Sequence, residues 1–341
     1  EMIFYFIYLL LIILISLFLK KKGLFLNYSG DNHQSFSNKG NVPLSGGIFL
    51  VLPIVFFYSN NLFLVPFLIA TFLIGFFSDR KILVSAKIRF FFQIFLIILF
   101  VIIFDLKILS SRIDLFDIML SNKFFAYFFS SFCLLILING SNFIDGLNGL
   151  LISYSLIVIY KLGNLGLIND QIIFDQYFYL ILSLFVVLLL LNILNILMMG
   201  DSGAYLIGFF LGFVIINSHV SNVGVSPYFY ISLIWYPCFE NLFSILRKLS
   251  RKFSPLSPDS KHLHQLVFFF IKKKLGLSII FSNNLSSAII IFFNFLIIHI
   301  CSLNPSNTVF QLKLIICSII FYISSYFLLK RFYKLNFIVK K

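Results

Sequence analysis

The sequence predicts an all-α polytopic integral membrane protein. Of its 341 residues, 60% are hydrophobic and only 11% are charged, whereas a soluble domain is typically about 25% charged. Apolar runs long enough for spanning helices recur along the chain, and Lys and Arg gather in alternate connections between them. We therefore predict about 11 transmembrane helices, with the N-terminus outside and the C-terminus in the cytoplasm.

Apolar runs of nearly the required length, about 20 residues, define the expected helices. They lie near 2–19, 43–58, 62–77, 88–104, 124–138, 147–162, 178–199, 203–216, 228–246, 286–303 and 311–329. The first run has no basic segment before it and no small-residue cleavage site after it, which favours a retained span over a signal peptide. Without an internal repeat or a long polar segment, residues 1–341 are predicted to form a single domain.

The net charge of +14 follows from the predicted topology. The Lys and Arg residues lie on the predicted cytoplasmic side, with the exceptions of Lys107, Arg112, Lys123, Lys161 and Lys313. This asymmetry is the positive-inside pattern, so the charge does not indicate a nucleic acid partner. It also places a basic surface where anionic head groups and phosphorylated substrates would meet it.

Acidic residues are rare and gather on the same predicted side. Five separate connections there carry one each: Asp31, Asp79, Asp145, Asp201 and Asp259. A sixth acid, Glu240, lies inside the ninth predicted span, nearer its inner end. Because charge at membrane depth is costly, such acids are functional candidates by default, and we expect one shared polar site.

Asp79 directly follows the third predicted span, in GFFSDRKILVSAKIR at 75–89. Lys87 and Arg89 lie a few residues further on. A solvated loop that obeys the positive-inside pattern explains this stretch equally well when it is taken alone.

A second polar segment, NGSNFIDGLNGL at 139–150, ends the apolar run before it. Asn139, Asn142 and Asp145 recur at every third position, a spacing that keeps side chains close together on a helix. Amide and carboxylate oxygens suit Mg²⁺ better than zinc. The segment is therefore a candidate to bind Mg²⁺, with a glycine-capped polar helix end as the alternative.

Asp201 lies in a third segment, GDSGAYLIGF at 200–209, where residues 200–203 separate two apolar runs. Ser202 is a candidate N-cap for the following span, and a helix N-terminus there would favour phosphate. An ordinary tight turn is the alternative, although an acid is an unusual choice beside so much hydrocarbon.

His262 and His264 lie in SPDSKHLHQL at 257–266, directly after Lys261. No third metal ligand lies near these two histidines in the sequence, so their spacing is only a weak indication of a zinc site. Imidazoles beside a lysine suit phosphate recognition through charge-assisted hydrogen bonds. Exposed loop histidines are the alternative.

Together with VPLSGG at 42–47, these segments resemble the polyprenyl-phosphate N-acetylhexosamine-1-phosphate transferases, which are glycosyltransferase family 4-like. The segments occur in that family's order and cover the chain from about 40 to 270. The combination is specific, although each segment alone is not. The predicted topology resembles that of the branch that transfers N-acetylglucosamine-1-phosphate.

The resemblance implies a multi-pass enzyme of a bacterial inner membrane, with its active site facing the cytoplasm. A polyprenyl phosphate in the bilayer, expected to be undecaprenyl phosphate, would attack a UDP-N-acetylhexosamine and release UMP. N-acetylglucosamine is the first sugar expected, and the product would start a surface glycan such as O-antigen of lipopolysaccharide or another cell-wall polysaccharide. Mg²⁺ is the implied cofactor, with Mn²⁺ as an alternative, and a homodimer is a further expectation.

The resemblance also implies roles for single residues. Asp201 would be the main Mg²⁺ ligand, with Asn142 as its partner. The implied catalytic residues are Asp79, Asp145, Asp201, His262 and His264. The implied substrate-binding residues are Asn139, Lys87, Arg89 and Lys261. Asp145 keeps two alternatives, a place near the metal or a contact to the uridine and ribose.

Three positions depart from the family pattern. Ser78 stands where an acid often precedes Asp79, Gln265 replaces the last histidine of the histidine motif, and Asn148 stands where an acid is common in the peptidoglycan enzyme. A phosphate monoester is already largely dianionic at neutral pH, so a separate base at position 78 need not be present. These changes argue against a pentapeptide-bearing substrate and leave a different sugar or a reduced activity open.

Two other classes of function remain as alternatives. One is a transporter or flippase of lipid-linked sugars, with the acids forming a cation path, and the other is an inactive scaffold. A transporter should carry ionisable groups near mid-membrane, often in two related halves. Here nearly all acids lie at one face and the halves are dissimilar, which favours an enzyme open to a cytosolic nucleotide.

Overall fold

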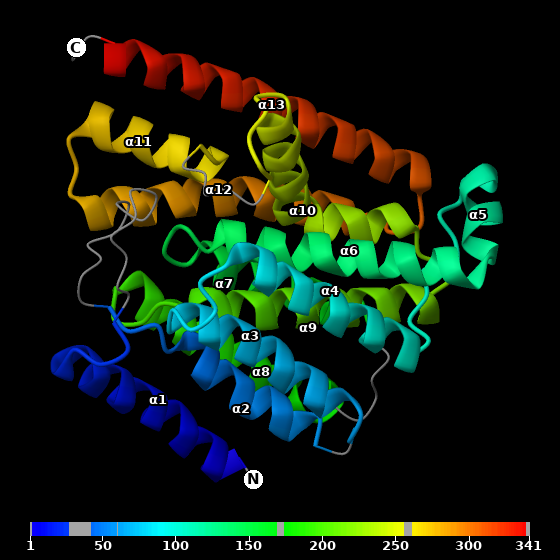
Figure 1. The fold of residues 1–341 in the computed structure, drawn as a ribbon, viewed down its shortest axis with the longest axis horizontal. Coiled ribbons are helices and arrows are strands. Elements are labelled where there is room, and N and C mark those ends of the chain that lie inside the picture. Colours follow the sequence, from blue (N-terminus) through cyan, green and yellow to red (C-terminus); the bar gives the residue numbers. More distant parts are fainter. Residues whose placement is uncertain (1, 27–41, 60, 169–173, 256–260, 339–341) are drawn as a thin grey trace.

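The computed structural model describes residues 2–26, 42–59, 61–168, 174–255 and 261–338 (Figure 1). Within them the chain is helical, apart from two isolated β-bridges that pair Leu26 with Pro43 and Leu44 with Met198. The helices are α1 (Met2–Lys22), α2 (Gly46–Phe57), α3 (Leu64–Asp79), α4 (Ala86–Ile103), α5 (Asp114–Ser121), α6 (Lys123–Ile144), α7 (Leu150–Asn164), α8 (Phe174–Ile193), α9 (Gly200–Ser221), α10 (Pro227–Leu249), α11 (Leu263–Leu275), α12 (Ile279–Cys301) and α13 (Thr308–Ile338).

The helices confirm the predicted all-helical architecture. Each predicted apolar run coincides with a helix, and 7 described helices are long and apolar enough to cross a membrane: α1, α4, α6, α9, α10, α12 and α13. Four more, α2, α3, α7 and α8, are apolar but shorter. Two helices were not predicted, because α5 is a short amphipathic segment and α11 follows a polar loop and ends in three lysines.

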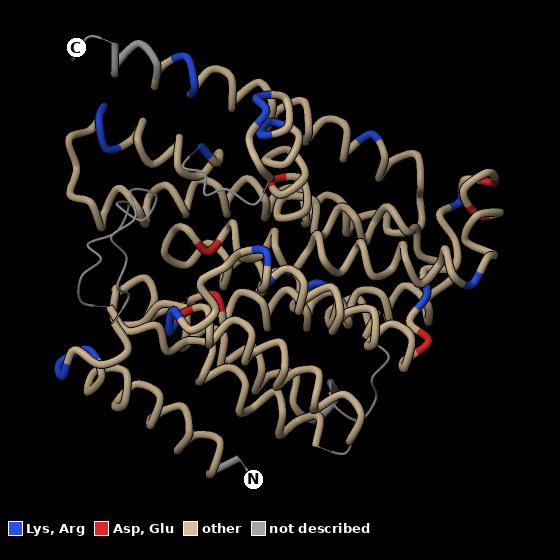
Figure 2. The backbone as a smooth tube through the Cα atoms, in the orientation of Figure 1, with Lys and Arg blue, Asp and Glu red and all other residues tan. Residues whose placement is uncertain are grey.

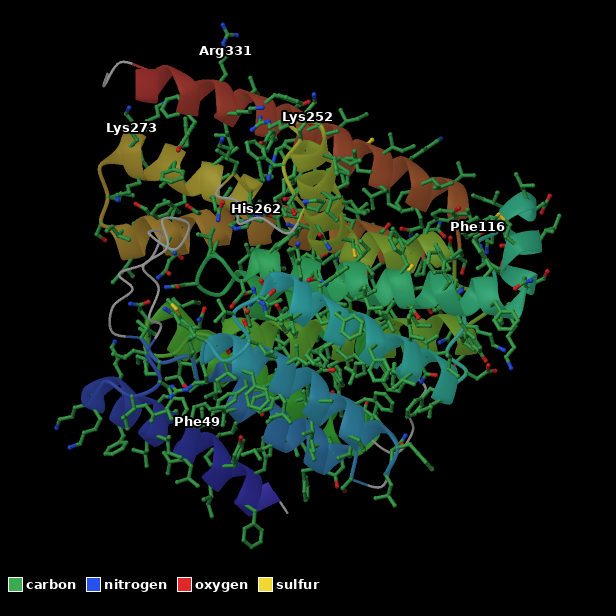
Figure 3. All side chains as sticks on the ribbon, in the orientation of Figure 1. Phe49, Phe116, Lys252, His262, Lys273 and Arg331 are labelled. Carbon is green, nitrogen blue, oxygen red and sulfur yellow. The ribbon has the colours of Figure 1, made fainter. Side chains whose placement is uncertain are left out.

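The outer faces of the bundle are apolar. Large side chains project outward from it (Figure 3). Phe4, Phe91, Phe124 and Phe128 are 78%, 64%, 85% and 66% exposed. An apolar surface of this extent would be a liability in water. It fits a surface that faces lipid, as expected of an integral membrane protein.

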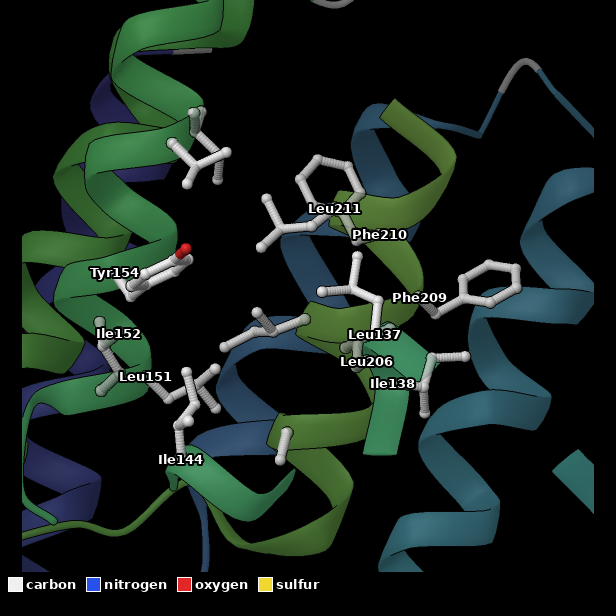
Figure 4. Packing of buried hydrophobic residues seen from close by; sticks show 14 of the residues in the cluster. Leu137, Ile138, Ile144, Leu151, Ile152, Tyr154, Leu206, Phe209, Phe210 and Leu211 are labelled. Atoms are coloured by element: carbon white, nitrogen blue, oxygen red, sulfur yellow. The ribbon is translucent and has the colours of Figure 1, made fainter. Parts of the chain in front are cut away.

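Helix α9 forms the centre of the bundle and is buried along almost its whole length. It contacts α2, α3, α6, α7 and α10. Leu137 and Ile138 of α6 meet Leu206 and Phe209 of α9 in the apolar core, and Tyr154 faces them from α7 (Figure 4). This central position brings the first turn of α9 close to the ends of several other helices.

Glycine allows α3 and α9 to approach backbone to backbone at the end of the bundle that carries Asp79. A Cβ atom on Gly75 would lie 2.4 Å from Ser202 Cα and 2.5 Å from the Asp201 carbonyl oxygen. Both distances are far below contact distance, and backbone atoms cannot turn away as a flexible side chain can. Gly75 therefore sets how closely α3 approaches the start of α9.

We expect Gly75→Ala to destabilise the protein by about 1–3 kcal/mol, because overpacking forces backbone shifts of this cost. The measurement is the midpoint of thermal unfolding in detergent. Gly224→Ala is the matched control, since a Cβ atom there would meet no atom within 4 Å. Equal losses for the two variants would contradict this account of the α3–α9 contact.

The connections that carry the predicted site lie at one end of the bundle. The α3–α4, α6–α7 and α8–α9 connections all lie at the left end in Figure 1, as does the C-terminal end of α1. Figure 2 shows most of each helix without charge, with Lys, Arg, Asp and Glu concentrated near helix ends and connections. The fold thus brings together three of the five predicted acids; Asp31 and Asp259 lie outside the described residues.

Candidate active site

Asp201 is the meeting point of four helices. Its Oδ2 atom accepts hydrogen bonds from the Arg89 guanidinium of α4 (2.7 Å) and from the Ser78 hydroxyl of α3, while its Oδ1 atom accepts one from Asn142 Nδ2 of α6 (2.7 Å). Arg89 also donates to Ser78. The Asp201 and Arg89 side chains remain 27% and 25% exposed, so this polar cluster is accessible to a ligand.

Asp79 holds the N-terminus of α9 from outside that helix. Its carboxylate accepts hydrogen bonds from the backbone N–H groups of Asp201 (2.8 Å) and Ser202 (3.0 Å) and from the Ser202 hydroxyl (2.7 Å). The first N–H groups of a helix have no partner within it, and here Asp79 of α3 supplies one. Gly200 makes room, because a Cβ atom on it would lie 2.7 Å from an Asp79 carboxylate oxygen.

Two expectations for this segment were wrong. Asp201 lies in the first turn of α9 rather than in a turn between two spans, since α9 begins at Gly200. Ser202 is not an N-cap, because it lies inside the helix and donates to Asp79. The anion that the helix N-terminus attracts in this structure is the carboxylate of Asp79, which is favourable for the same reason as a bound phosphate would be.

The three residues spaced three apart on α6 do not share one contact. Asn139 donates to Gln93 Oε1 of α4 (3.2 Å), whereas Asn142 donates to Asp201. Asp145 is half-buried at the C-terminal end of α6. Each step of three residues falls about 60° short of a full turn, so the side chains fan out around the helix instead of converging.

The predicted basic contacts differ in their surroundings. Arg89 is bonded directly to Asp201, while Lys87, two residues away, is exposed. Lys261 is half-buried, and its carbonyl oxygen accepts a hydrogen bond from Arg247 of α10 (2.6 Å). The structure thus gives Arg89 a defined place in the site and leaves Lys87 at its edge.

The two histidines of HLH are buried and stacked. His262 and His264 have ring centroids 5.5 Å apart with nearly parallel planes, and Phe143 of α6 lies 4.9 Å from His262. A Cβ atom on Gly146 would lie 2.7 Å from His264 Nε2. The last turn of α6 therefore joins the histidines to the Asp201 cluster, because Asn142 precedes Phe143 and reaches Asp201.

His264 is fully buried, and neither of its ring nitrogens has a hydrogen-bond partner among the residues that the structure describes. Burial lowers the pKa of His264 to about 3, so the ring is neutral near pH 7. A neutral imidazole has one donor and one acceptor. A buried polar group without a partner is costly, which is a physical reason to expect a ligand or water beside this ring.

Two departures from the family pattern acquire contacts in the structure. Ser78 donates to Asp201, so it completes the environment of that acid instead of supplying a second one. Gln265 accepts a hydrogen bond from the His262 backbone N–H (3.1 Å) and thereby caps α11. Sequence reasoning singled out Ser78 only as a missing acid and had no signal for the capping role of Gln265.

The residues around Asp201 fit a Mg²⁺ ion that substrate phosphates would help to hold. Among the residues that the structure describes, no group of three or more His, Cys, Asp and Glu side chains is arranged to bind a metal. Mg²⁺ is often held by only one or two carboxylates together with phosphates and water. Asp201 and Asn142 offer such oxygens, provided that the Asn142 amide turns its oxygen toward the ion.

The segment that carries the Asp201 cluster matches a known protein family. Residues 61–219, which include α3, α4, α6 and the first turn of α9, match the model of glycosyl transferase family 4. The match covers just under half of the chain. The family 4 segment includes the whole Asp201 cluster, whereas both histidines lie beyond it.

Similar proteins share the name undecaprenyl-phosphate alpha-N-acetylglucosaminyl 1-phosphate transferase. The one from Salmonella typhi is 26% identical over 245 residues, which cover 67% of this chain and 66% of the relative. The one from Thermotoga maritima is 26% identical over 242 residues, covering 69% of each chain. The one from Escherichia coli (strain K12) is 28% identical over 150 residues, covering 42% of this chain and 41% of the relative.

The chain spans just under two thirds of the length of the relative from Salmonella typhi, so that match is partial. Together with the apolar helices, the comparisons identify a membrane-integral protein related to transferases that act on undecaprenyl phosphate.

Proposed function

We propose that this protein transfers an N-acetylhexosamine-1-phosphate from a UDP-sugar to polyprenyl phosphate. The observation that carries the proposal is the convergence of Arg89, Asn142 and Ser78 on Asp201 at one end of an apolar bundle. An arginine beside stacked histidines suits a diphosphate, and a carboxylate there can share a Mg²⁺ ion with the phosphates. The relatives' names make undecaprenyl phosphate the first acceptor to test and N-acetylglucosamine the first sugar.

In the proposed reaction, an oxygen of polyprenyl phosphate attacks the β-phosphorus of the UDP-sugar. The new P–O bond forms as the bond between the β-phosphorus and the bridging oxygen breaks, and UMP leaves with that oxygen. A polyprenyl-diphosphate-sugar remains in the bilayer. Such a transfer depends mainly on positioning and on neutralising negative charge, so the protein needs few groups that exchange protons.

The residues divide this task between them. Arg89 neutralises phosphate charge and holds the Asp201 carboxylate in place, while Asp79 fixes the turn that carries Asp201. His262 and His264 bind the diphosphate, with Lys261, Lys87 and Asn139 as further substrate contacts.

Asp145 would lie beside the bound substrate, because it precedes Gly146, the residue against His264. When bound, Mg²⁺, or Mn²⁺ in its place, would neutralise the diphosphate; Asp201 and Asn142 would hold it.

The proposed topology has eleven crossings, one for each long or short apolar helix, with the N-terminus outside and the C-terminus in the cytoplasm. Its support is the positive-inside pattern and the position of the site connections at one end of the bundle. The active site would then face the cytoplasm of a bacterial inner membrane, where nucleotide sugars occur. Residues 1–341 would form one domain that starts O-antigen or another cell-wall glycan, and a homodimer is part of the proposal.

A transporter or flippase is the rival. Among the residues whose burial is described, Glu240 is the acid buried inside a long apolar helix, and both of its carboxylate oxygens are bonded to side chains of other elements. An acid held in this way is a poor carrier for a moving cation. The enzyme is therefore the function that the geometry supports better.

We expect UMP release when purified protein is incubated with undecaprenyl phosphate, Mg²⁺ and UDP-N-acetylglucosamine. A panel of other UDP-sugars tests the sugar specificity, and omission of undecaprenyl phosphate is the control for simple hydrolysis. Chelation of the metal is expected to stop the reaction. The absence of UMP release with every sugar would overturn the proposed function.

A further inference from the structure

Glu240 is a fully buried acid with two specific partners. It lies in α10 at 0% exposure, and its Oε1 atom lies 2.9 Å from His262 Nδ1. Its Oε2 atom accepts a hydrogen bond from the Tyr322 hydroxyl of α13 (2.7 Å). Three helical elements that are distant in sequence thus meet at one carboxylate.

This arrangement determines which ring nitrogen of His262 carries a proton. An ionised carboxylate only accepts hydrogen bonds, so both neighbours must donate. His262 Nδ1 is therefore protonated, and Nε2 is the nitrogen left for a ligand. Phe143 and His264 both pack close to the ring, at centroid distances of 4.9 and 5.5 Å, and restrict its rotation.

A second set of contacts from the same helices holds the chain just before the histidine. Arg247 of α10 donates to the Lys261 carbonyl oxygen and to the Tyr326 hydroxyl of α13 (3.1 Å). The His262 backbone N–H is held by Gln265. The position of the ring is thus fixed at its backbone and at Nδ1.

Burying a carboxylate in a bilayer-spanning helix needs a reason beyond stability. A buried ion pair often contributes no more stability than well-packed apolar residues would. A carboxylate that orients a histidine, however, fixes its tautomer and ring direction, and such partners commonly affect function strongly. Glu240 has the geometry for that role.

We propose that Glu240 and Tyr322 are positioning residues that keep His262 protonated on Nδ1 and aim Nε2 at the sugar diphosphate. A phosphate oxygen only accepts hydrogen bonds, so the ring that binds it carries a proton on Nε2 as well. This rests on the proposed transferase function, in which His262 binds that diphosphate. It also gives α13, which lies outside the family 4 segment, a part in the active site.

The first test is a set of conservative variants assayed by UMP release. Glu240→Gln, which removes only the charge, is expected to lower kcat/KM roughly 10–100-fold. Tyr322→Phe, which removes one hydrogen bond to Glu240, is expected to lower it about 2–10-fold. Tyr236→Phe is the matched control, because the Tyr236 hydroxyl is buried near Glu240 and has no hydrogen-bond partner in the described part of the chain. Its kcat/KM should equal that of the wild type.

The decisive comparison is between the His262→Ala variant and the double variant that carries both His262→Ala and Glu240→Gln. If Glu240 acts through His262, the double variant will be no slower than His262→Ala, to within about twofold, because the interaction has already been removed. Losses that multiply would overturn the proposal and leave Glu240 a purely structural role. Thermal unfolding checks each variant, and if Glu240→Gln does not fold, Tyr322→Phe carries the same comparison.

A second readout does not require activity. NMR spectra of protein labelled with ¹⁵N-histidine report on the ring nitrogens directly. The chain has 5 histidines, and the signals lost in His262→Ala identify the His262 ring. We expect Nδ1 to be protonated in the wild type. A neutral ring with its proton on Nε2 would overturn the inference even if transferase activity is found, whereas absent UMP release with a protonated Nδ1 would overturn the proposed function alone.

Discussion

Asp201→Asn is expected to reduce UMP release by at least about 10²-fold while the protein remains folded. Asn has nearly the same shape as Asp but lacks the charge that pairs with Arg89 at 2.7 Å. It also removes the carboxylate proposed to hold Mg²⁺. Because the side chain is partly exposed and the backbone N–H of Asp201 still reaches Asp79, the first turn of α9 should keep its position.

Two measurements decide this prediction: the initial rate of UMP release and the midpoint of thermal unfolding. Asp114→Asn makes the same chemical change at an exposed residue of α5 and should leave the rate unchanged. If the Asp201→Asn variant is as active as the wild type, Asp201 has no part in the proposed reaction.

Asp79→Asn is expected to reduce both activity and stability. The Asp79 carboxylate accepts three hydrogen bonds from the start of α9, and an amide offers only one oxygen for them. Losing a helix cap costs about 0.5–2 kcal/mol. Once this turn is free to shift, Asp201 no longer lies against Arg89 and Asn142, so the rate should fall with the stability.

The contrast between the two aspartates separates their roles. Added Mg²⁺ should not restore the stability of Asp79→Asn in the absence of substrate, since the lost partners are backbone N–H groups. The same assays and the same Asp114→Asn control apply. An Asp79→Asn variant with wild-type stability but no activity would contradict the capping role and would indicate that Asp79 contacts the substrate itself.

The sequence predicted most of the fold because membrane helices leave a strong local signal. Runs such as 88–104 and 286–303 are apolar at nearly every position and need no partner to be recognised. Helices α5 and α11 were missed because they are short and partly polar, and such segments become helical only through contacts made elsewhere in the fold.

The site was predicted as a set of segments but not as a set of contacts. Asp79 is bonded to Asp201, and the end of α6 that carries Asp145 packs against the two histidines. The sequence did not reveal that Asp79 caps α9, that Ser78 bonds to Asp201, or that Asn139 turns toward Gln93. Each of these contacts joins residues on different helices, so their spacing along the chain does not encode them.

The sequence by itself determined that this protein lies in a membrane, where its helices run and which segments hold its chemistry, because hydrophobicity and charge act on each segment locally. Only the tertiary structure decided which polar groups become partners. Asp79 and Glu240 are both acids of largely apolar helices, yet one holds the backbone of α9 and the other holds a histidine. That difference arises because a buried polar group must find a partner wherever packing places one.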